Sequence, residues 1–137
     1  MNSEAVPEAQ ITEPAILFRI SKVYRSDMTA LELYEATRGF WRLGKKLSAR
    51  AEAAQLAFAV YQGVIREVYR IESWHPAGTL PYTSRDPGPY RGKNRREFSG
   101  PVATDLRNRY VGHSVRHHFP QGNRAPFKYV NCSTGPD

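Results

Sequence analysis

The feature that most constrains the fold is a long strand-like run in the middle of the chain. Residues 56–74, LAFAVYQGVIREVYRIESW, are dominated by Val, Ile, Tyr and Phe, with Gly63 near the centre. At about 3.3 Å per residue, a single strand of this length would be too long for a small domain. Gly63 therefore marks a bulge, a sharp bend or a turn between two strands. Two strands that coil sharply around a glycine are typical of the corner of a small closed barrel.

Further elements can be assigned on both sides of this run. A β-rich stretch at residues 15–24 predicts a strand, and Thr29 with Glu32 forms a capping box at the start of a helix that reaches Trp41. After the run we expect a loop at 75–96, a short strand at 96–103, a second helix at 104–119 and a last strand at 126–132. This order predicts the α+β class, with a small, strongly bent β-barrel and two flanking helices.

The 137 residues have the length of one domain. We expect residues 1–14 to be a disordered acidic leader, 15–132 the barrel domain and 133–137 a short tail. The lone cysteine, Cys132, excludes an internal disulfide and is typical of a reducing compartment. The polar, acidic N-terminus is unlike a secretory signal, and no run of about 18 apolar residues is present. These features predict a cytoplasmic protein.

The charge is unevenly distributed along the chain. The formal net charge is +7, but residues 1–35 carry −3, so the rest of the chain carries +10. A basic body behind an acidic leader is the electrostatic pattern of a protein that binds a polyanion such as DNA or RNA. High solubility is the simpler alternative, because many small proteins are basic without binding nucleic acid.

Residues 34–46, YEATRGFWRLGKK, combine aromatic rings with cations and have no acid after Glu35. One interpretation is a stacking platform beside groups that bind phosphates. The alternative is that the aromatics share the buried face of an amphipathic helix. Arg38 is the strongest candidate, because it lies between aromatics and we expect its guanidinium to line a cleft near Tyr34, Trp41 or Trp74. The candidate binding residues here are Tyr34, Arg38, Trp41, Lys45 and Lys46.

The long loop at 75–96 interleaves cations with aromatics, a pattern used to recognise single-stranded or flipped bases. A solvated, partly disordered loop is an equally weighted alternative. The candidates from this region are Trp74, Tyr90, Arg91, Lys93, Arg95 and Arg96. Arg109 and Arg116 add a basic face to the expected second helix.

The residues favour binding over catalysis. His113 and His117 are four apart, but a third metal ligand is lacking nearby, so a pair of surface histidines is favoured over a metal site. No Gly-rich phosphate loop, nucleophile motif or pair of carboxylates at a useful spacing is present, and acids are sparse after Glu97. We expect no metal and no cofactor, and a role as an enzyme is less favoured.

The segments LYEATRGFW, AFAVYQGVIREVYRIESW, EFSGPVA and KYVNC, in this order, resemble the PUA-like superfamily, which includes the EVE, ASCH and YTH domains. The middle segment also resembles small bacterial domains found alone or beside nucleases. The resemblance implies a barrel with a cleft beside the first helix that receives a modified or flipped base. It places Tyr34, Arg38 and Trp41 on one wall, and Trp74 with the 82–96 loop on the other. The expected function is a non-catalytic nucleic-acid-binding module; a protein-interaction module for an acidic partner surface is the alternative.

Overall fold

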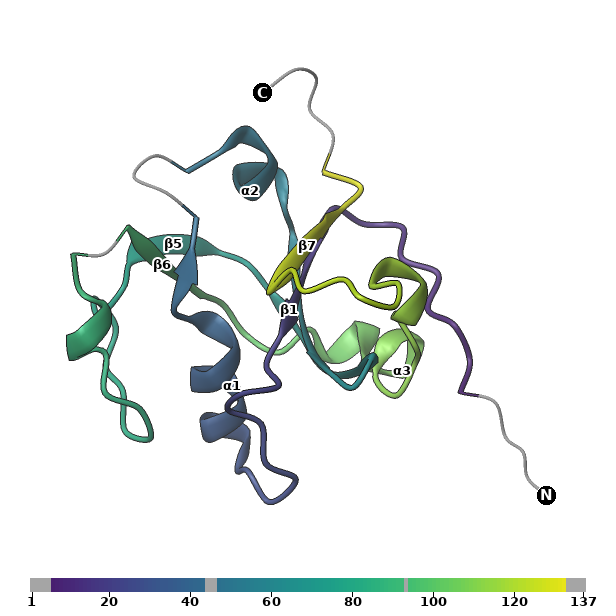
Figure 1. Cartoon of the computed structure of the whole chain (residues 1–137), viewed down its shortest axis with the longest axis horizontal. Coiled ribbons are helices and arrows are strands. Elements are labelled where there is room, and N and C mark those ends of the chain that lie inside the picture. The colour runs from purple at the N-terminus through teal and green to yellow at the C-terminus, as the bar shows by residue number, and fades with distance from the viewer. Residues whose placement is uncertain (1–5, 44–46, 93, 133–137) are drawn as a thin grey trace.

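The computed structural model describes residues 6–43, 47–92 and 94–132 (Figure 1). Lys45, Lys46 and Lys93 lie outside the described residues, as do the first five residues of the expected leader and the expected tail at 133–137. No helix within the described ranges has both the length and the apolar composition needed to cross a membrane.

A four-stranded sheet forms the centre of the molecule (Figure 1). Its strands, in spatial order, are β4 (Val64–Arg70), β3 (Leu56–Tyr61), β1 (Ala15–Arg19) and β7 (Phe127–Val130). β1 runs parallel to β3, and the other two pairs are antiparallel. The glycine predicted to interrupt the central run lies in a two-residue hairpin turn, where Gln62 and Gly63 have φ values of 51° and 74°. Positive φ at both central positions matches the twist of the flanking strands, so the prediction of two strands around Gly63 is confirmed.

A second, three-stranded sheet has the order β2 (Trp41–Arg42), β6 (Arg95–Ser99) and β5 (Ser73–Pro76). Both of its strand pairs are antiparallel. The α+β class is thus confirmed, but the described strands form two sheets, and no closed barrel is found among them.

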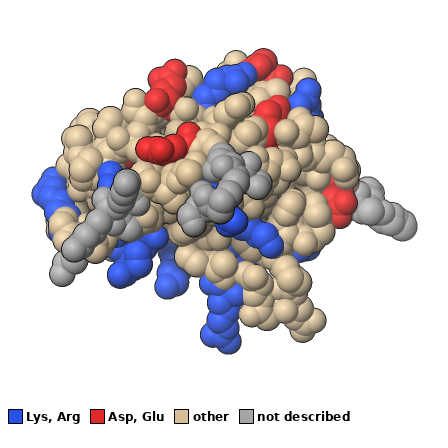
Figure 2. Space-filling view, turned by 90° about the horizontal axis from the view of Figure 1, so that it is seen from above, with Lys and Arg blue, Asp and Glu red and all other residues tan. Residues whose placement is uncertain are grey.

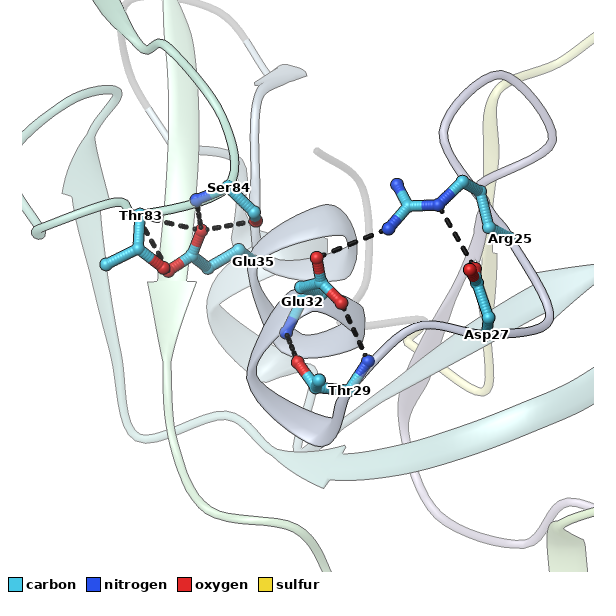
Figure 3. Close-up of polar contacts among 7 residues, drawn as sticks. All are labelled: Arg25, Asp27, Thr29, Glu32, Glu35, Thr83 and Ser84. Atoms are coloured by element: carbon cyan, nitrogen blue, oxygen red, sulfur yellow. Dashed lines mark hydrogen bonds and ion pairs between the residues drawn. The ribbon is translucent and has the colours of Figure 1, made fainter.

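The first helix, α1 (Ala30–Arg38), begins as predicted. Thr29 accepts a hydrogen bond from the Glu32 backbone N–H, and the Glu32 side chain accepts one from the Thr29 N–H (Figure 3). The helix ends at Gly39, so Phe40 follows the helix and Trp41 lies on β2. The expectation that the helix reaches Trp41 is wrong. A short helix, α2 (Ala49–Ala53), is capped by Ser48 and precedes β3.

The predicted second helix at 104–119 is wrong. This segment forms a 3-10 turn at Thr104–Leu106, a single helical turn α3 (Arg107–Tyr110) and a further 3-10 turn at Arg116–His118. Between them the backbone is extended and bonds to the β4 edge: Ile65 N–H donates to the His113 carbonyl at 2.9 Å, and Val115 N–H to the Gly63 carbonyl at 2.8 Å. An open strand edge needs partners that a closed helix could not supply. Arg109 and Arg116 therefore share no helix face.

The expectation of a disordered leader through residue 14 is wrong for its described part. The Ala9 N–H donates to the Ser114 carbonyl at 2.8 Å, and the Ser114 N–H donates to the Pro7 carbonyl at 2.7 Å. Ala9 is buried, with 2% of its surface exposed. Residues 7–9 thus form a strap beside the extended 113–115 segment.

Two apolar clusters flank the central sheet. One packs Leu17, Phe58 and Val68 against Tyr110 from α3. The other lies between the two sheets, where the Phe18 ring is stacked on Trp41 with centroids 4.5 Å apart and faces Phe98 at 6.0 Å. In Figure 1 the second sheet and the loop after β5 lie on one side of the central sheet, and α3 lies on the other. Trp41 and β2 are thereby fixed next to the end of β1.

Candidate functional site

A cleft of about 620 Å³ opens where four chain segments meet. They are the end of β1 with the turn after it, the end of α1 with β2, the loop between β5 and β6, and the segment before β7. Among the described residues, six cations and no Asp or Glu line this cleft. The six cations are Arg19, Lys22, Arg42, Arg85, Arg95 and Arg124. The walls therefore favour an anionic ligand.

Three of the six cations are free to pair with a ligand. Lys22, Arg42 and Arg124 are exposed. Within the described ranges, their side chains have no hydrogen-bond acceptor and no acidic partner. They form an exposed group of charges around the cleft.

The other three cations are held in place by backbone carbonyls. Arg19 donates through Nη1 to the carbonyls of Asn123 and Ala125, at 2.9 and 3.0 Å. Arg95 donates through Nη1 to the Phe40 carbonyl at 3.0 Å. Arg85 donates through Nη1 to the Glu35 carbonyl at 2.9 Å and also to the Gly39 carbonyl.

These bonds leave part of each guanidinium available. The Nε and Nη2 atoms of Arg19, Arg85 and Arg95 have no acceptor among the described residues, and none of these atoms is buried. Burial lowers the pKa of Arg85, but an arginine remains charged at neutral pH. The three guanidiniums are thus oriented in advance, with N–H groups left for a ligand.

The position of Arg85 follows from the end of α1. The last carbonyls of a helix have no partner within the helix and attract a cation. Arg85 bonds to these carbonyls, and its guanidinium lies 4.4 Å from the centroid of the Phe40 ring. A planar guanidinium suits both contacts at once.

Aromatic rings form the floor of the cleft beside these cations. The Phe40 and Tyr90 rings are stacked with centroids 4.8 Å apart, and Arg95 lies 5.2 Å from the Tyr90 centroid. Phe40 is buried, whereas Tyr90 and Trp41 are half-buried. Trp41 donates through its indole N–H to the Thr37 carbonyl at 2.7 Å. Half-buried Tyr90 and Trp41 rings can therefore meet a ligand in the cleft.

Two buried carboxylates hold the loop that supplies Arg85 and Tyr90. Glu97 accepts hydrogen bonds from the Gly78 N–H, the Leu80 N–H and the Tyr82 hydroxyl, at 2.9, 2.6 and 2.7 Å. Glu35 accepts from the backbone N–H and the hydroxyl of both Thr83 and Ser84 (Figure 3). Burial raises the pKa of Glu35, but these hydrogen bonds outweigh it and leave the pKa below its usual value. Residues 78–84 are therefore held by hydrogen bonds to Glu35 and Glu97, and the alternative of a partly disordered loop does not apply to them.

Arg38 lies beneath this loop and not in the cleft. Its side chain is sandwiched between the rings of Tyr34 and Tyr82, with its guanidinium carbon 4.8 and 4.3 Å from their centroids, and it donates to the Pro81 carbonyl. Only 5% of Arg38 is exposed, and its Nε is buried without a partner. The guanidinium is near Tyr34 as expected, but its predicted place on a cleft is wrong, because residues 81–84 cover it.

The other predicted residues are dispersed. Trp41, Tyr90 and Arg95 line the cleft. Tyr34 packs on Tyr69 in the core, and Trp74 packs on Phe98. Arg91 donates to the Gly78 carbonyl at 3.5 Å, and Arg109 pairs with Glu13 at 3.2 Å. Arg96 lies on β6 opposite Trp41, and Arg116 lines a second hollow.

Sequence reasoning missed most of the cleft. The residues outside the predicted set include Arg19, Lys22, Arg42 and Arg124, whereas Phe40 lies in the 34–46 stretch and Arg85 in the basic loop that the sequence singled out. Arg19 and Lys22 lie in the part of the chain that is acidic on average, and Arg124 is over a hundred residues away from them. The pairing of β7 with β1 and the hydrogen bonds from Arg19 to the Asn123 and Ala125 carbonyls bring these segments together.

Figure 2 shows several Lys and Arg side chains along the lower edge of the view, where no Asp or Glu is visible, while Asp, Glu and further Lys and Arg side chains lie together above them. No group of three or more His, Cys, Asp or Glu side chains that could hold a metal ion is found in the described ranges. The chain matches no family model, and comparisons with curated proteins and with solved structures found no match.

Proposed function

We propose that the cleft binds nucleic acid, with an unpaired or modified base against its aromatic floor and phosphates on its cations. One observation carries the proposal: six cations and three aromatic side chains line one cleft that contains no acid. Stacking of a base on an aromatic ring contributes about 1–3 kcal/mol. Charge-assisted hydrogen bonds from arginine to phosphate are short and strong.

The anchored arginines support this proposal. Ordering a long side chain opposes binding by about 0.5–1.5 kcal/mol. Arg19, Arg85 and Arg95 are already ordered by carbonyls, so a ligand that meets their free N–H groups avoids most of this loss. The Phe40 ring also contacts the Arg85 guanidinium, and the Tyr90 ring contacts that of Arg95.

The proposal is for binding without catalysis. Glu35 and Glu97, the buried carboxylates nearest in sequence to the cleft residues, each accept several hydrogen bonds from the 78–84 loop. Because their carboxylate oxygens accept these hydrogen bonds, a structural role is favoured over a role as general base. The resemblance of the sequence to PUA-like domains supports the proposal of a PUA-like module. The lone cysteine supports a place in the reducing cytoplasm.

The test is a titration of fluorescently labelled single-stranded DNA and RNA at low salt. Arg42→Ala/Arg124→Ala removes two exposed cations of the cleft, and Arg107→Ala/Arg109→Ala removes two arginines outside it. We expect the first double variant to lose about tenfold or more in affinity and the second to change little. Absence of binding by the wild-type protein, or equal losses in both variants, would contradict the proposal.

An acidic protein surface is the competing ligand, because it would also be attracted by the exposed Lys22, Arg42 and Arg124. Pull-down from lysate with and without nuclease separates the two. Partners that survive nuclease treatment and are lost in Arg42→Ala/Arg124→Ala would favour the protein partner.

A further inference from the structure

A second hollow adjoins the cleft. It has a volume of about 570 Å³, and Arg19 lines both hollows. Its other lining residues come from the β3–β4 turn and from residues 116–121, and they include Arg116 but no acid. Both volumes lie within the range of about 300–1,000 Å³ that is common for ligand sites.

Arg19 forms the shared wall between the two hollows. Its guanidinium carbon lies 4.4 Å from the centroid of the Phe119 ring, which lines the second hollow. Its Nη1 bonds to the carbonyls of Asn123 and Ala125, and Ala125 lines the first cleft. The unpaired N–H groups of Arg19 are therefore held at the passage from one hollow to the other.

Arg116 is also held in position. Its Nη2 donates to the Gln62 carbonyl at 2.9 Å. Its side chain lies against Gly63, so closely that a Cβ at this position would be 2.3 Å from the Arg116 Cγ. The glycine of the hairpin turn thus makes room for the arginine, and the exposed guanidinium keeps its remaining N–H groups for a ligand.

We propose that a single strand of nucleic acid passes from the cleft around Arg19 into the second hollow, where Arg116 binds a flanking phosphate. This inference rests on the proposed function of the cleft. A single strand fits both the aromatic floor, which needs an exposed base face, and the line of anchored arginines along the backbone. We expect a strand of several nucleotides to occupy both hollows.

The test compares a trinucleotide with a strand of about twelve nucleotides, within the range of known single-strand sites. The full chain is titrated by fluorescence polarisation, and Arg116→Ala is compared with Arg109→Ala, which removes an exposed arginine that lines neither hollow. We expect Arg116→Ala to weaken binding of the longer strand about tenfold and to leave the trinucleotide unchanged. The slope of log K against log salt should become shallower by about 0.7 for the longer strand. Arg109→Ala should match the wild type.

Three results would overturn the inference. Equal losses of affinity for the longer strand in Arg116→Ala and Arg109→Ala would show that the second hollow does not bind the strand. Duplex of the same length that binds as tightly, with the same loss in Arg116→Ala, would exclude a single strand as the occupant. Failure of the wild-type protein to bind any strand would remove the proposed function as well, whereas loss of binding in Arg42→Ala/Arg124→Ala alone would leave that function standing.

Discussion

The Arg85 guanidinium lies 4.4 Å from the centroid of the Phe40 ring while its Nη1 bonds to carbonyls at the end of α1. This pair joins the helix end, the loop after β5 and the floor of the cleft. Arg85 is held by backbone carbonyls, and no ion pair with an acid is found for it among the described residues, so part of its guanidinium is left for an anionic ligand. Arg19 and Arg95 are held in the same way. Each donates to a backbone carbonyl, and their guanidiniums lie over the rings of Phe119 and Tyr90.

The Glu35 carboxylate should stabilise the protein in a pH-dependent way. Folding lowers the pKa of Glu35, so its contribution is present above the unfolded carboxyl pKa of about 4.3 and is lost as the pH falls through the folded-state value. Glu35→Gln should lower the free energy of unfolding by about 1–3 kcal/mol at neutral pH. Urea unfolding between about pH 7 and pH 3 should show this difference shrinking as the pH falls. The exposed Glu52→Gln is the control, and a difference that does not depend on pH would contradict the assignment.

Arg38 should matter for stability and not through direct contact with a ligand. Arg38→Lys keeps the charge but loses the planar stack between Tyr34 and Tyr82. We expect a loss of about 1–3 kcal/mol in the free energy of unfolding, measured by urea denaturation. Affinity for nucleic acid, measured where the variant is fully folded, should change less than in Arg42→Ala/Arg124→Ala. A large loss of affinity with an unchanged free energy of unfolding would show that Arg38 contacts the ligand and contradict this prediction.

Tyr90 should contribute to base stacking. Tyr90→Ala removes a half-buried ring from the floor of the cleft and should weaken single-strand binding by about 1–3 kcal/mol. Tyr90→Phe keeps the ring and should bind like the wild type. The loss in Tyr90→Ala should disappear on a strand in which the central bases are replaced by abasic sites. An equal loss on abasic strands would mean that the ring acts only on the structure of the cleft.

Gly63 should be needed both for the hairpin and for Arg116. Gly63→Ala strains a residue with φ of 74° and places a Cβ against the Arg116 side chain. Gly112→Ala is the matched control, because Gly112 has φ of 86° but no atom within 4 Å of the added Cβ. In both variants the backbone strain should lower the free energy of unfolding by about 1 kcal/mol or more. Only Gly63→Ala should also weaken binding of the longer strand; the same binding by both variants would show that Arg116 does not depend on Gly63.

Local features of this chain could be predicted from its sequence. The capping box at Thr29 and Glu32 and the turn at Gly63 depend on neighbouring residues, and both are found where they were expected. The helix expected at 104–119 depended on local pattern too, but the β4 edge binds the backbone of residues 113–115 and prevents it. Hydrogen bonding to a strand edge that is distant in the sequence cannot be inferred from the residues of the segment itself.

The cleft was harder to predict because its parts come from distant segments. Arg19 and Arg124 line the same cleft because β1 pairs with β7 and Arg19 bonds to the carbonyls on either side of Arg124. The burial of Arg38 depends on Glu35 and Glu97, whose hydrogen bonds fold the 78–84 loop over it. Nothing in the sequence indicates these hydrogen bonds to the loop, so we expected Arg38 to line a cleft.

The most direct test of the account is an NMR titration that follows the arginine Nε–H resonances of the wild-type protein. A single strand of about twelve nucleotides is added at low salt. We expect the Nε–H signals of Arg19, Arg85 and Arg95 to shift on binding, because these groups have no acceptor among the described residues of the free protein, while that of Arg109 stays in place. Binding of the strand with these three signals unchanged would contradict the central claim that the cleft is the nucleic-acid site.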